Sequence, residues 1–272
     1  MASPPRFFLQ GHPEPGPPRL AEGEAVHATR VLRLRPGDPC VGLDGRGHAW
    51  PMRVAAVGRR DLGLELTGAP EHEPEPGTPG APLPWIEVAV AWPRRPRAEE
   101  MLRRLTQLGV ARITPLVARR SGPQSGPRSD AGDGKRGGEG SSTPPEPGEA
   151  RWLKLLQDAC KQSRRAWLPD LGEARSPLEL LLARPGAAVA LLDPERGMSL
   201  DTWARSLAPD AGCGTREHPI VLAVGPEGGF DAEERDAFHR KGATSVRLAP
   251  HVLRIETAAE AAMAVAATVW MR

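Results

Sequence analysis

From residue 85 onwards, short runs of apolar residues alternate with longer amphipathic stretches. Near-continuous apolar runs of this kind are typical of strands buried on both faces of a parallel sheet. The amphipathic stretches place apolar side chains at helical spacing, and in 98–110 Met101, Leu105 and Leu108 share one face. This alternation predicts an α/β domain with a mostly parallel sheet. The predicted strands are 85–92, 111–117, 187–193, 219–225 and 245–249, and the predicted helices are 98–110, 151–167, 231–242 and 257–270.

For three of these helices, the sequence also predicts where the helix begins or which of its faces is polar. Asp231 with Glu234, and Thr257 with Glu260, have the spacing of a capping box and predict where two helices begin. In the 151–167 helix, the apolar side chains fall on one face. The polar face of that helix is predicted to hold Lys154, Asp158, Lys161 and Arg165.

The first 70 residues predict a separate β-rich unit. Residues 41–57 are two short runs around a Gly-Arg-Gly turn, the pattern of a hairpin, and 62–68 alternates as a third strand. Before them, 27–38 predicts a short helix that ends in a Pro-Gly turn. The spacing of the turns is that of a small barrel. The proline-rich stretch 71–84 marks a domain boundary.

Residues 121–150 form a second atypical stretch. They contain 18 Gly, Ser or Pro residues and no Leu, Ile, Val, Phe, Met or Trp. Such a segment cannot bury enough apolar surface to order itself, so a disordered insertion is predicted. A G-x-G-x-x-G pattern at 132–137 lies inside it, without the strand and helix that give this motif meaning, and therefore does not indicate a dinucleotide site.

Charge is balanced overall but uneven along the chain. The 36 Lys and Arg residues exceed the 34 Asp and Glu residues by two, which does not by itself indicate a nucleic-acid-binding protein. Residues 94–120, however, contain eight Arg and two acidic residues, and 151–175 contain six basic and three acidic residues. These patches are either ordinary solvated surface or sites that hold a phosphate backbone.

Cysteine usage and hydropathy limit the class of protein. Cys40, Cys160 and Cys213 lie far apart, without the spacing of a disulfide framework, and the seven histidines form no pair at standard metal spacing, so no metal is expected. There is no signal-peptide pattern and no apolar run long enough to span a membrane. These observations predict a soluble cytoplasmic protein in a reducing compartment.

Two loops that follow predicted strands carry the candidate chemistry. In VLAVGPEGGFDAEE (221–234), a buried strand ends in a Gly-Pro-Glu-Gly-Gly turn and a helix follows at once. In RLAPHVLRIETAAE (247–260), Arg254 and Glu256 stand just before the predicted helix. Because ligands bind at the carboxyl ends of strands in open α/β sheets, the two loops predict a shared pocket. The alternatives are a tight strand–helix connection and a surface ion pair.

These residues resemble those of the SPOUT-class RNA methyltransferases, and more narrowly the RsmE-type 16S ribosomal RNA uracil-N3 methyltransferases. GPEGGF (225–230) and LRIETA (253–258) are the most specific motifs. HATRVLRLRPGD (27–38), RRLTQLGVARITPL (103–116) and QDACKQSRRAWLP (157–169) are similar to other family segments. The sequence departs from the family at Ala249 and Arg164, where the family has glycine.

The resemblance implies a PUA-like β-barrel RNA-binding domain at 1–72, a linker at 73–84, and a SPOUT-type α/β domain with a C-terminal trefoil knot at 85–272. It further implies S-adenosylmethionine (SAM) as methyl donor, 16S ribosomal RNA of the small subunit as partner, and a homodimer packed through the knot region. The implied reaction is methylation of N3 of a specific uridine. Two alternatives stay open: methylation of another RNA position, and a non-catalytic RNA-binding relative.

The resemblance also implies three groups of site residues. The cofactor-binding residues are Leu192, Gly225, Pro226, Glu227, Gly228, Gly229, Leu248, Leu253, Arg254 and Thr257. The catalytic candidates are Arg165, Arg254 and Glu256, where Glu256 either accepts a proton or orients Arg254. The RNA-binding candidates are Arg6, His27, Arg30, Arg33, Arg94, Arg104 and Arg165.

Overall fold

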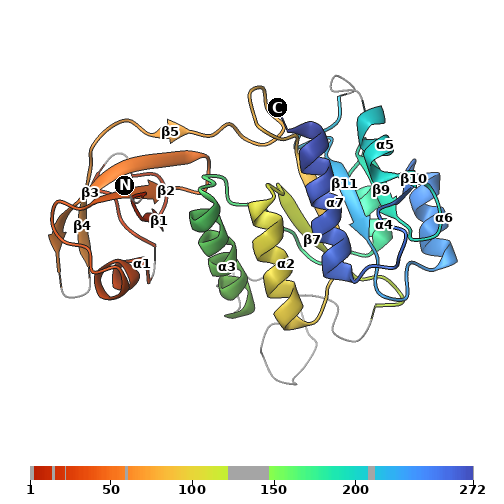
Figure 1. The fold of residues 1–272 in the computed structure, drawn as a ribbon, viewed down its shortest axis with the longest axis horizontal. Helices are drawn as coiled ribbons and strands as arrows, with labels where there is room; N and C mark the ends of the chain where they lie inside the picture. The colour runs from red at the N-terminus through yellow and green to blue at the C-terminus, as the bar shows by residue number, and fades with distance from the viewer. Residues whose placement is uncertain are drawn as a thin grey trace. The chain divides into compact units, whose positions relative to one another are not determined.

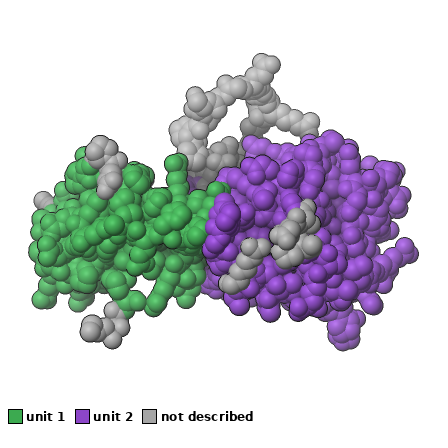
Figure 2. Space-filling model, turned by 90° about the horizontal axis from the view of Figure 1, so that it is seen from above, with its two compact units in different colours: residues 1–75, 157–168 green, residues 76–156, 169–272 purple. Residues whose placement is uncertain are grey.

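The computed structural model divides the chain into two compact units. Unit 1 comprises residues 1–75 and 157–168, and unit 2 comprises residues 76–156 and 169–272 (Figure 2). Within the part of the chain that is described, every helix is too short or too polar to cross a lipid bilayer. The described residues are 3–13, 16–21, 23–58, 61–121, 147–207 and 212–271.

Unit 2 is built on a sheet in which every strand pairing is parallel. The order across the sheet is β10 (Met198–Ser199), β12 (Thr244–Arg247), β9 (Ala188–Leu192), β11 (Ile220–Val224), β6 (Ile86–Ala91), β7 (Arg112–Leu116) and β8 (Asp170–Leu171). The five predicted strands form its centre. Strands β6, β7, β9 and β11 are mostly buried, which explains their apolar sequences, whereas β12 buries only Val246. This arrangement confirms the predicted α/β class with a mostly parallel sheet.

Helices cover both faces of this sheet (Figure 1). Helices α2 (Arg95–Gln107), α5 (Leu200–Ser206) and α7 (Ile255–Trp270) form one group, in which α7 contacts the other two and also β11 and β6. Helices α4 (Pro177–Leu182) and α6 (Ala232–Arg240) contact each other and share a buried core with alternate residues of the strands. The longest helix, α3 (Pro147–Ser163), contains the boundary between the units.

The structure shows that one of the two predicted capping boxes forms and the other does not. Asp231 caps α6 as predicted, because its side chain accepts from the backbone N–H of Glu234 and the Glu234 carboxylate accepts from that of Asp231. The capping box predicted at Thr257 is wrong. Helix α7 begins two residues earlier, at Ile255, because Ile255 is buried and belongs to the apolar stripe of the helix. The Glu260 carboxylate instead accepts from Arg104 at 2.9 Å.

Unit 1 contains a five-stranded sheet. Its strands are β1 (Arg6–Phe8), β2 (Pro39–Leu43), β3 (His48–Val57), β4 (Leu62–Leu66) and β5 (Glu71–His72), with β5 and β4 both pairing with β3. The predicted hairpin is confirmed as the antiparallel pair β2–β3. A short helical segment, α1 (Glu24–Val26) continued by the π-helical turn η1 (His27–Val31), contributes Ala28 to the buried core beneath the sheet.

The predicted insertion 121–150 lies mostly outside the described residues. Residues 122–146 are not described, so the prediction of disorder is not tested there. Its last four residues, 147–150, belong to the first turn of α3.

Candidate functional site

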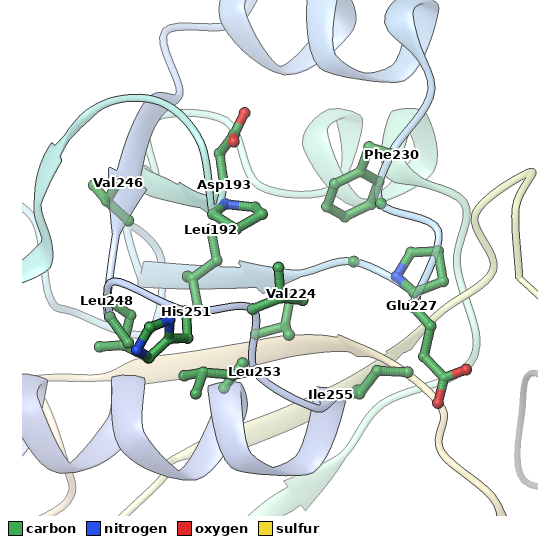
Figure 3. Close-up of a pocket in the computed structure, with 17 residues that line it drawn as sticks. Leu192, Asp193, Val224, Glu227, Phe230, Val246, Leu248, His251, Leu253 and Ile255 are labelled. Carbon is green, nitrogen blue, oxygen red and sulfur yellow. The ribbon is translucent and has the colours of Figure 1, made fainter.

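A pocket opens at the carboxyl ends of β9, β11 and β12 in unit 2 (Figure 3). These are three neighbouring strands, which is where an open α/β sheet places its ligands. The space between its walls amounts to about 670 Å³, a value that includes the open solvent at its mouth. Its lining residues are Leu192, Asp193, Pro194, Val224, Gly225, Pro226, Glu227, Gly229, Phe230, Val246, Leu248, Ala249, His251, Val252, Leu253, Ile255 and Ala258.

The glycine-rich loop after β11 forms one wall because its backbone turns sharply. The N–H of Gly229 donates to the carbonyl of Pro226 at 2.8 Å, and Gly229 has a φ of +67°, a conformation that favours glycine. Phe230 then anchors the loop, because its ring packs in the core against Phe238 with centroids 5.1 Å apart. Asp231 starts α6 immediately afterwards.

The opposite wall comes from the segment that follows β12 and from the start of α7. Leu248, Leu253 and Ile255 supply apolar surface from this side, facing Leu192 from β9 (Figure 3). The ends of β9 and β12 are tied together, because the N–H of Asp193 donates to the carbonyl of Val246 at 3.0 Å. The pocket is therefore an apolar slot with polar groups near its edge.

A charge cluster lies beside the pocket, at the start of α7. Arg97 of α2 donates to the Glu256 carboxylate at 3.4 Å and also approaches Glu227 of the glycine-rich loop at 3.8 Å. The second oxygen of Glu256, Oε2, is buried and has no hydrogen-bond partner among the described residues. Arg254 is exposed and forms no ion pair with any described residue. The predicted contact between Glu256 and Arg254 is therefore not formed, and Arg97 takes its place.

Comparisons with known proteins show which family shares this arrangement. A family model described as an RNA methyltransferase domain matches residues 80–135 and 141–267. The chain belongs to this family. It is 30% identical over 264 residues to the ribosomal RNA small subunit methyltransferase E of Mycobacterium bovis, covering 94% of this chain and 88% of that protein. It is 28% identical to the protein of the same name from Synechocystis, covering 90% of this chain and 71% of the relative.

A solved structure has the same fold. The crystal structure of a ribosomal RNA small subunit methyltransferase E from Neisseria gonorrhoeae bound to S-adenosyl methionine is 24% identical, with a TM-score of 0.75. The match covers 98% of each chain. At 24% identity, this structural similarity shows that the two proteins share a fold and nothing more.

Most residues predicted to bind the cofactor line the pocket. They are Leu192, Gly225, Pro226, Glu227, Gly229, Leu248 and Leu253. Gly228, Arg254 and Thr257 are not part of the lining. Gly228 lies beside Arg120, whose guanidinium donates to the Gly228 carbonyl at 2.9 Å.

Arg165 differs most from its predicted environment. Helix α3 ends at Ser163 and Arg164 has a φ of +62°, so Arg165 leaves the polar face of the helix. Its side chain is buried in unit 1, and this burial lowers the pKa of its guanidinium. The prediction that Arg165 lies on the polar face of the helix is therefore wrong. Arg165 belongs to unit 1, whereas the other catalytic candidates, Arg254 and Glu256, belong to unit 2.

In unit 1, three RNA-binding candidates on and just after η1 are exposed and therefore accessible to a polyanion: His27, Arg30 and Arg33. Arg6 is partly buried and donates to the carbonyl of Arg164 at 3.3 Å. Burial, followed by the nearby Arg164, lowers the pKa of Arg6.

The RNA-binding candidates of unit 2 both lie at α2. Arg94 is exposed at the N-cap of the helix. Arg104 is paired with Glu260 at 2.9 Å and with Glu100 at 3.0 Å. Arg104 is thus already neutralised by two carboxylates, unlike Arg94.

Several pocket residues were not predicted from the sequence. Asp193 directly follows β9, Val224 is the last residue of β11, and Val246 is the penultimate residue of β12. No local motif marks these residues. They can be identified from the strand order β12-β9-β11, because this order places the ends of the three strands side by side.

Proposed function

We propose that this protein uses SAM to methylate N3 of a specific uridine in 16S ribosomal RNA of the small subunit. The observation that carries the proposal is the pocket between the GPEGGF loop and the LRIETA segment, at the ends of three adjacent parallel strands. The membership of the RNA methyltransferase family and the names of the relatives support it. The relative from Neisseria gonorrhoeae, solved with S-adenosyl methionine, supports the choice of cofactor.

The residues present fit SAM. The apolar slot suits the adenine ring, which we assign to Leu248 and Leu253, with Leu192 on the other side. The carboxylates of Asp193 and Glu227 lie at the edge, where they favour the cationic groups of the cofactor. When bound, SAM supplies an electrophilic methyl group. The turns at 225–229 and 248–254 hold the cofactor through their backbone groups, so that positioning is the main contribution of the protein.

The reaction also requires loss of the uracil N3 proton and stabilisation of charge on the ring oxygens. We assign the stabilisation to Arg254, which follows Leu253 of the pocket and has no competing ion pair among the described residues. Glu256 is the proposed proton acceptor, because its Oε2 atom has no hydrogen-bond partner within the described chain. N3 lies on the pairing face of uracil, so the base must be unpaired or extruded.

The RNA contact is proposed to involve both units. Residues 1–72 are the proposed PUA-like barrel, in which the exposed side chains of His27, Arg30 and Arg33 offer positive charge to phosphates. Residues 85–272 are the proposed SPOUT domain, joined to the barrel by the linker 73–84. Arg165 stays a candidate for contact with RNA, but its burial means that it also supports the folding of unit 1.

The strand order supports a C-terminal trefoil knot. The chain passes from β11 to β12, which lies on the other side of β9, and then returns to α7, which packs on β11 and β6. The segment between β12 and α7 therefore crosses the carboxyl ends of β9 and β11. We also infer a homodimer through this region, since α7 presents small, partly exposed Ala261 and Ala264. The three free cysteines agree with a cytoplasmic location.

Two measurements on one preparation test the proposal. Calorimetric titration with SAM measures cofactor binding, and labelled SAM incubated with small subunits from a strain lacking the enzyme measures transfer. We expect saturable binding and the appearance of N3-methyluridine in 16S ribosomal RNA. Binding without N3-methyluridine but with another methylated nucleoside supports the alternative target. Absence of SAM binding to the folded protein supports the non-catalytic relative.

A further inference from the structure

A group of histidines and one aspartate lies in unit 1, away from the residues of the SAM pocket. His12 follows β1, and Asp44 and His48 flank the β2–β3 turn. One ligand atom from each of these three residues lies within 4.8 Å of the other two. The sequence shows no metal spacing here because His12 is distant along the chain, and the fold brings it to the hairpin.

Asp44 is held in a fixed orientation. Its Oδ1 atom accepts from the backbone N–H groups of Arg46 at 2.8 Å and His48 at 3.1 Å. Its Oδ2 atom is directed at the imidazoles, 2.8 Å from Nδ1 of His48 and 3.8 Å from Nδ1 of His12. The Asp44 side chain is 3% exposed, so this carboxylate is nearly buried and its Oδ2 atom faces two nitrogen ligands. Backbone bonds of this kind fix a carboxylate for metal coordination.

These distances are close to those of a coordination sphere. Zinc binds imidazole nitrogen and carboxylate oxygen at about 2.0–2.2 Å, which places tetrahedral ligand atoms about 3.3–3.6 Å apart. The separations of the two Nδ1 atoms from Asp44 Oδ2, 2.8 and 3.8 Å, bracket that range, and all three ligand atoms lie within 4.8 Å of one another. Further imidazole is near, because the ring of His72 lies 5.0 Å from that of His48.

We propose that His12, Asp44 and His48 bind a divalent first-row transition metal ion, with Zn²⁺ as the best match to two imidazoles and one carboxylate. Asp44 and the two histidines supply three ligands, and a water molecule completes the tetrahedron. The ion replaces the proton between Asp44 and His48 and ties the segment after β1 to the β2–β3 hairpin. Because the unfolded chain lacks this preformed site, metal binding stabilises unit 1.

The ligand geometry also indicates which variants are informative. Asp44 holds the hairpin turn through its backbone bonds, so its removal disturbs folding as well as binding. The His12 side chain is 51% exposed, and its loss should leave the apo protein folded. His12→Ala is therefore the decisive variant, with His48→Ala as the second. His27→Ala is the matched control, since His27 is an exposed histidine on η1 outside the cluster.

The experiment titrates Zn²⁺ and Co²⁺ into the metal-stripped, full-length protein without an affinity tag. We expect one tight Zn²⁺ site per chain, a tetrahedral Co²⁺ absorption spectrum, and a higher unfolding midpoint with metal. His12→Ala should weaken Zn²⁺ binding at least about 10–100-fold, the loss typical even of outer-shell changes, and His27→Ala should not.

The proposal is overturned by wild-type protein that binds no Zn²⁺. It is equally overturned if His12→Ala binds Zn²⁺ as tightly as the wild type, which indicates binding elsewhere. The midpoint of each apo variant confirms that it is folded. None of these readouts depends on SAM or RNA, so they are independent of the proposed methyltransferase function.

Discussion

Arg97 of α2 donates a hydrogen bond to Glu256 at the start of α7, across 3.4 Å and 159 positions of sequence. The same guanidinium lies 3.8 Å from Glu227 in the glycine-rich loop. A single cation thereby links the two segments that form opposite walls of the pocket. Glu256 is 13% exposed and Arg97 is 34% exposed, so water screens this contact less than it screens a surface pair.

Removal of Arg97 should affect both folding and the pocket. Arg97→Ala leaves the partly buried Glu256 carboxylate without its cation, which costs about 1–3 kcal/mol of unfolding free energy. It should also weaken SAM binding, because the loop at Glu227 loses its tether. Arg103→Ala is the control: Arg103 pairs with Glu100 on the exposed face of the same helix, and its loss should cost less than about 0.5 kcal/mol. Equal effects of the two variants in chemical denaturation would contradict this account.

The glycine-rich loop allows a matched pair of substitutions. A Cβ atom at Gly225 would lie 2.9 Å from the ring of Phe230, whereas one at Gly228 would lie 3.5 Å from Arg120, an ordinary contact. Gly225→Val should therefore reshape the pocket wall and reduce SAM affinity, and Gly228→Ala should bind SAM normally. Calorimetric titration of both variants, with circular dichroism to confirm folding, checks the expectation. If Gly225→Val bound SAM with wild-type affinity, the cofactor would have to bind outside this pocket.

Arg164 occupies a backbone conformation that favours glycine. Its φ is +62°, and the family resemblance implies glycine at this position. Left-handed backbone costs a residue with a Cβ atom roughly 1–2 kcal/mol, partly offset by the greater freedom of glycine in the unfolded chain. Arg164→Gly should therefore raise the unfolding midpoint, while Arg164→Ala should not. Thermal unfolding distinguishes them, and equal midpoints for both variants would remove strain as the explanation.

Glu87 is a fully buried charge in the central strand β6. Its carboxylate accepts from Arg184 Nε at 2.6 Å and from the Thr114 hydroxyl at 2.5 Å. Arg184→Ala should destabilise the protein by about 3–5 kcal/mol, because it leaves this anion without its closest cation. Adding Glu87→Gln to Arg184→Ala should recover part of the loss. Arg205→Ala, which breaks an exposed pair with Asp201, should leave the unfolding midpoint unchanged. A double variant no more stable than Arg184→Ala would refute the electrostatic explanation.

The cysteines should differ in reactivity and in their effect on pH stability. Burial raises the pKa of Cys160 to about 12 and that of Cys40 to about 11, so both stay neutral thiols at pH 8. Alkylation of the native protein should therefore modify Cys213, which is partly exposed, and spare the other two. In the unfolded chain these thiols ionise near their ordinary pKa, so stability should fall as the pH rises above about 9. Rapid modification of all three native thiols, read by mass spectrometry, would show this account to be wrong.

Sequence patterns correctly predicted the buried strands and the helix cap that depend on residues close together along the chain. The apolar runs at β6, β9 and β11 are buried on both faces, and the Asp231–Glu234 pair caps α6 as its spacing indicates. Helices α4 and α5 were not predicted, because with six and seven residues they are too short for a periodic signal.

Sequence patterns failed at residues whose surroundings depend on contacts between distant parts of the chain. Arg165 has helical spacing from Lys161, but the chain turns at Arg164 and buries it. Glu256 lies next to Arg254 along the chain, yet its cation comes from α2. Asp193 has no motif around it, and it joins the pocket through the neighbouring strand ends. Such positions depend on strand order and helix packing, which a single sequence does not specify.

The most direct test of the account is the nucleoside composition of 16S ribosomal RNA in cells with and without this protein. We expect mass mapping to find one N3-methyluridine in wild-type cells, none in cells lacking the gene, and restoration by the wild-type gene. An expressed, folded Gly225→Val protein should restore less of the modification, because its pocket is altered. Unchanged N3-methyluridine in cells lacking the gene would contradict the central claim.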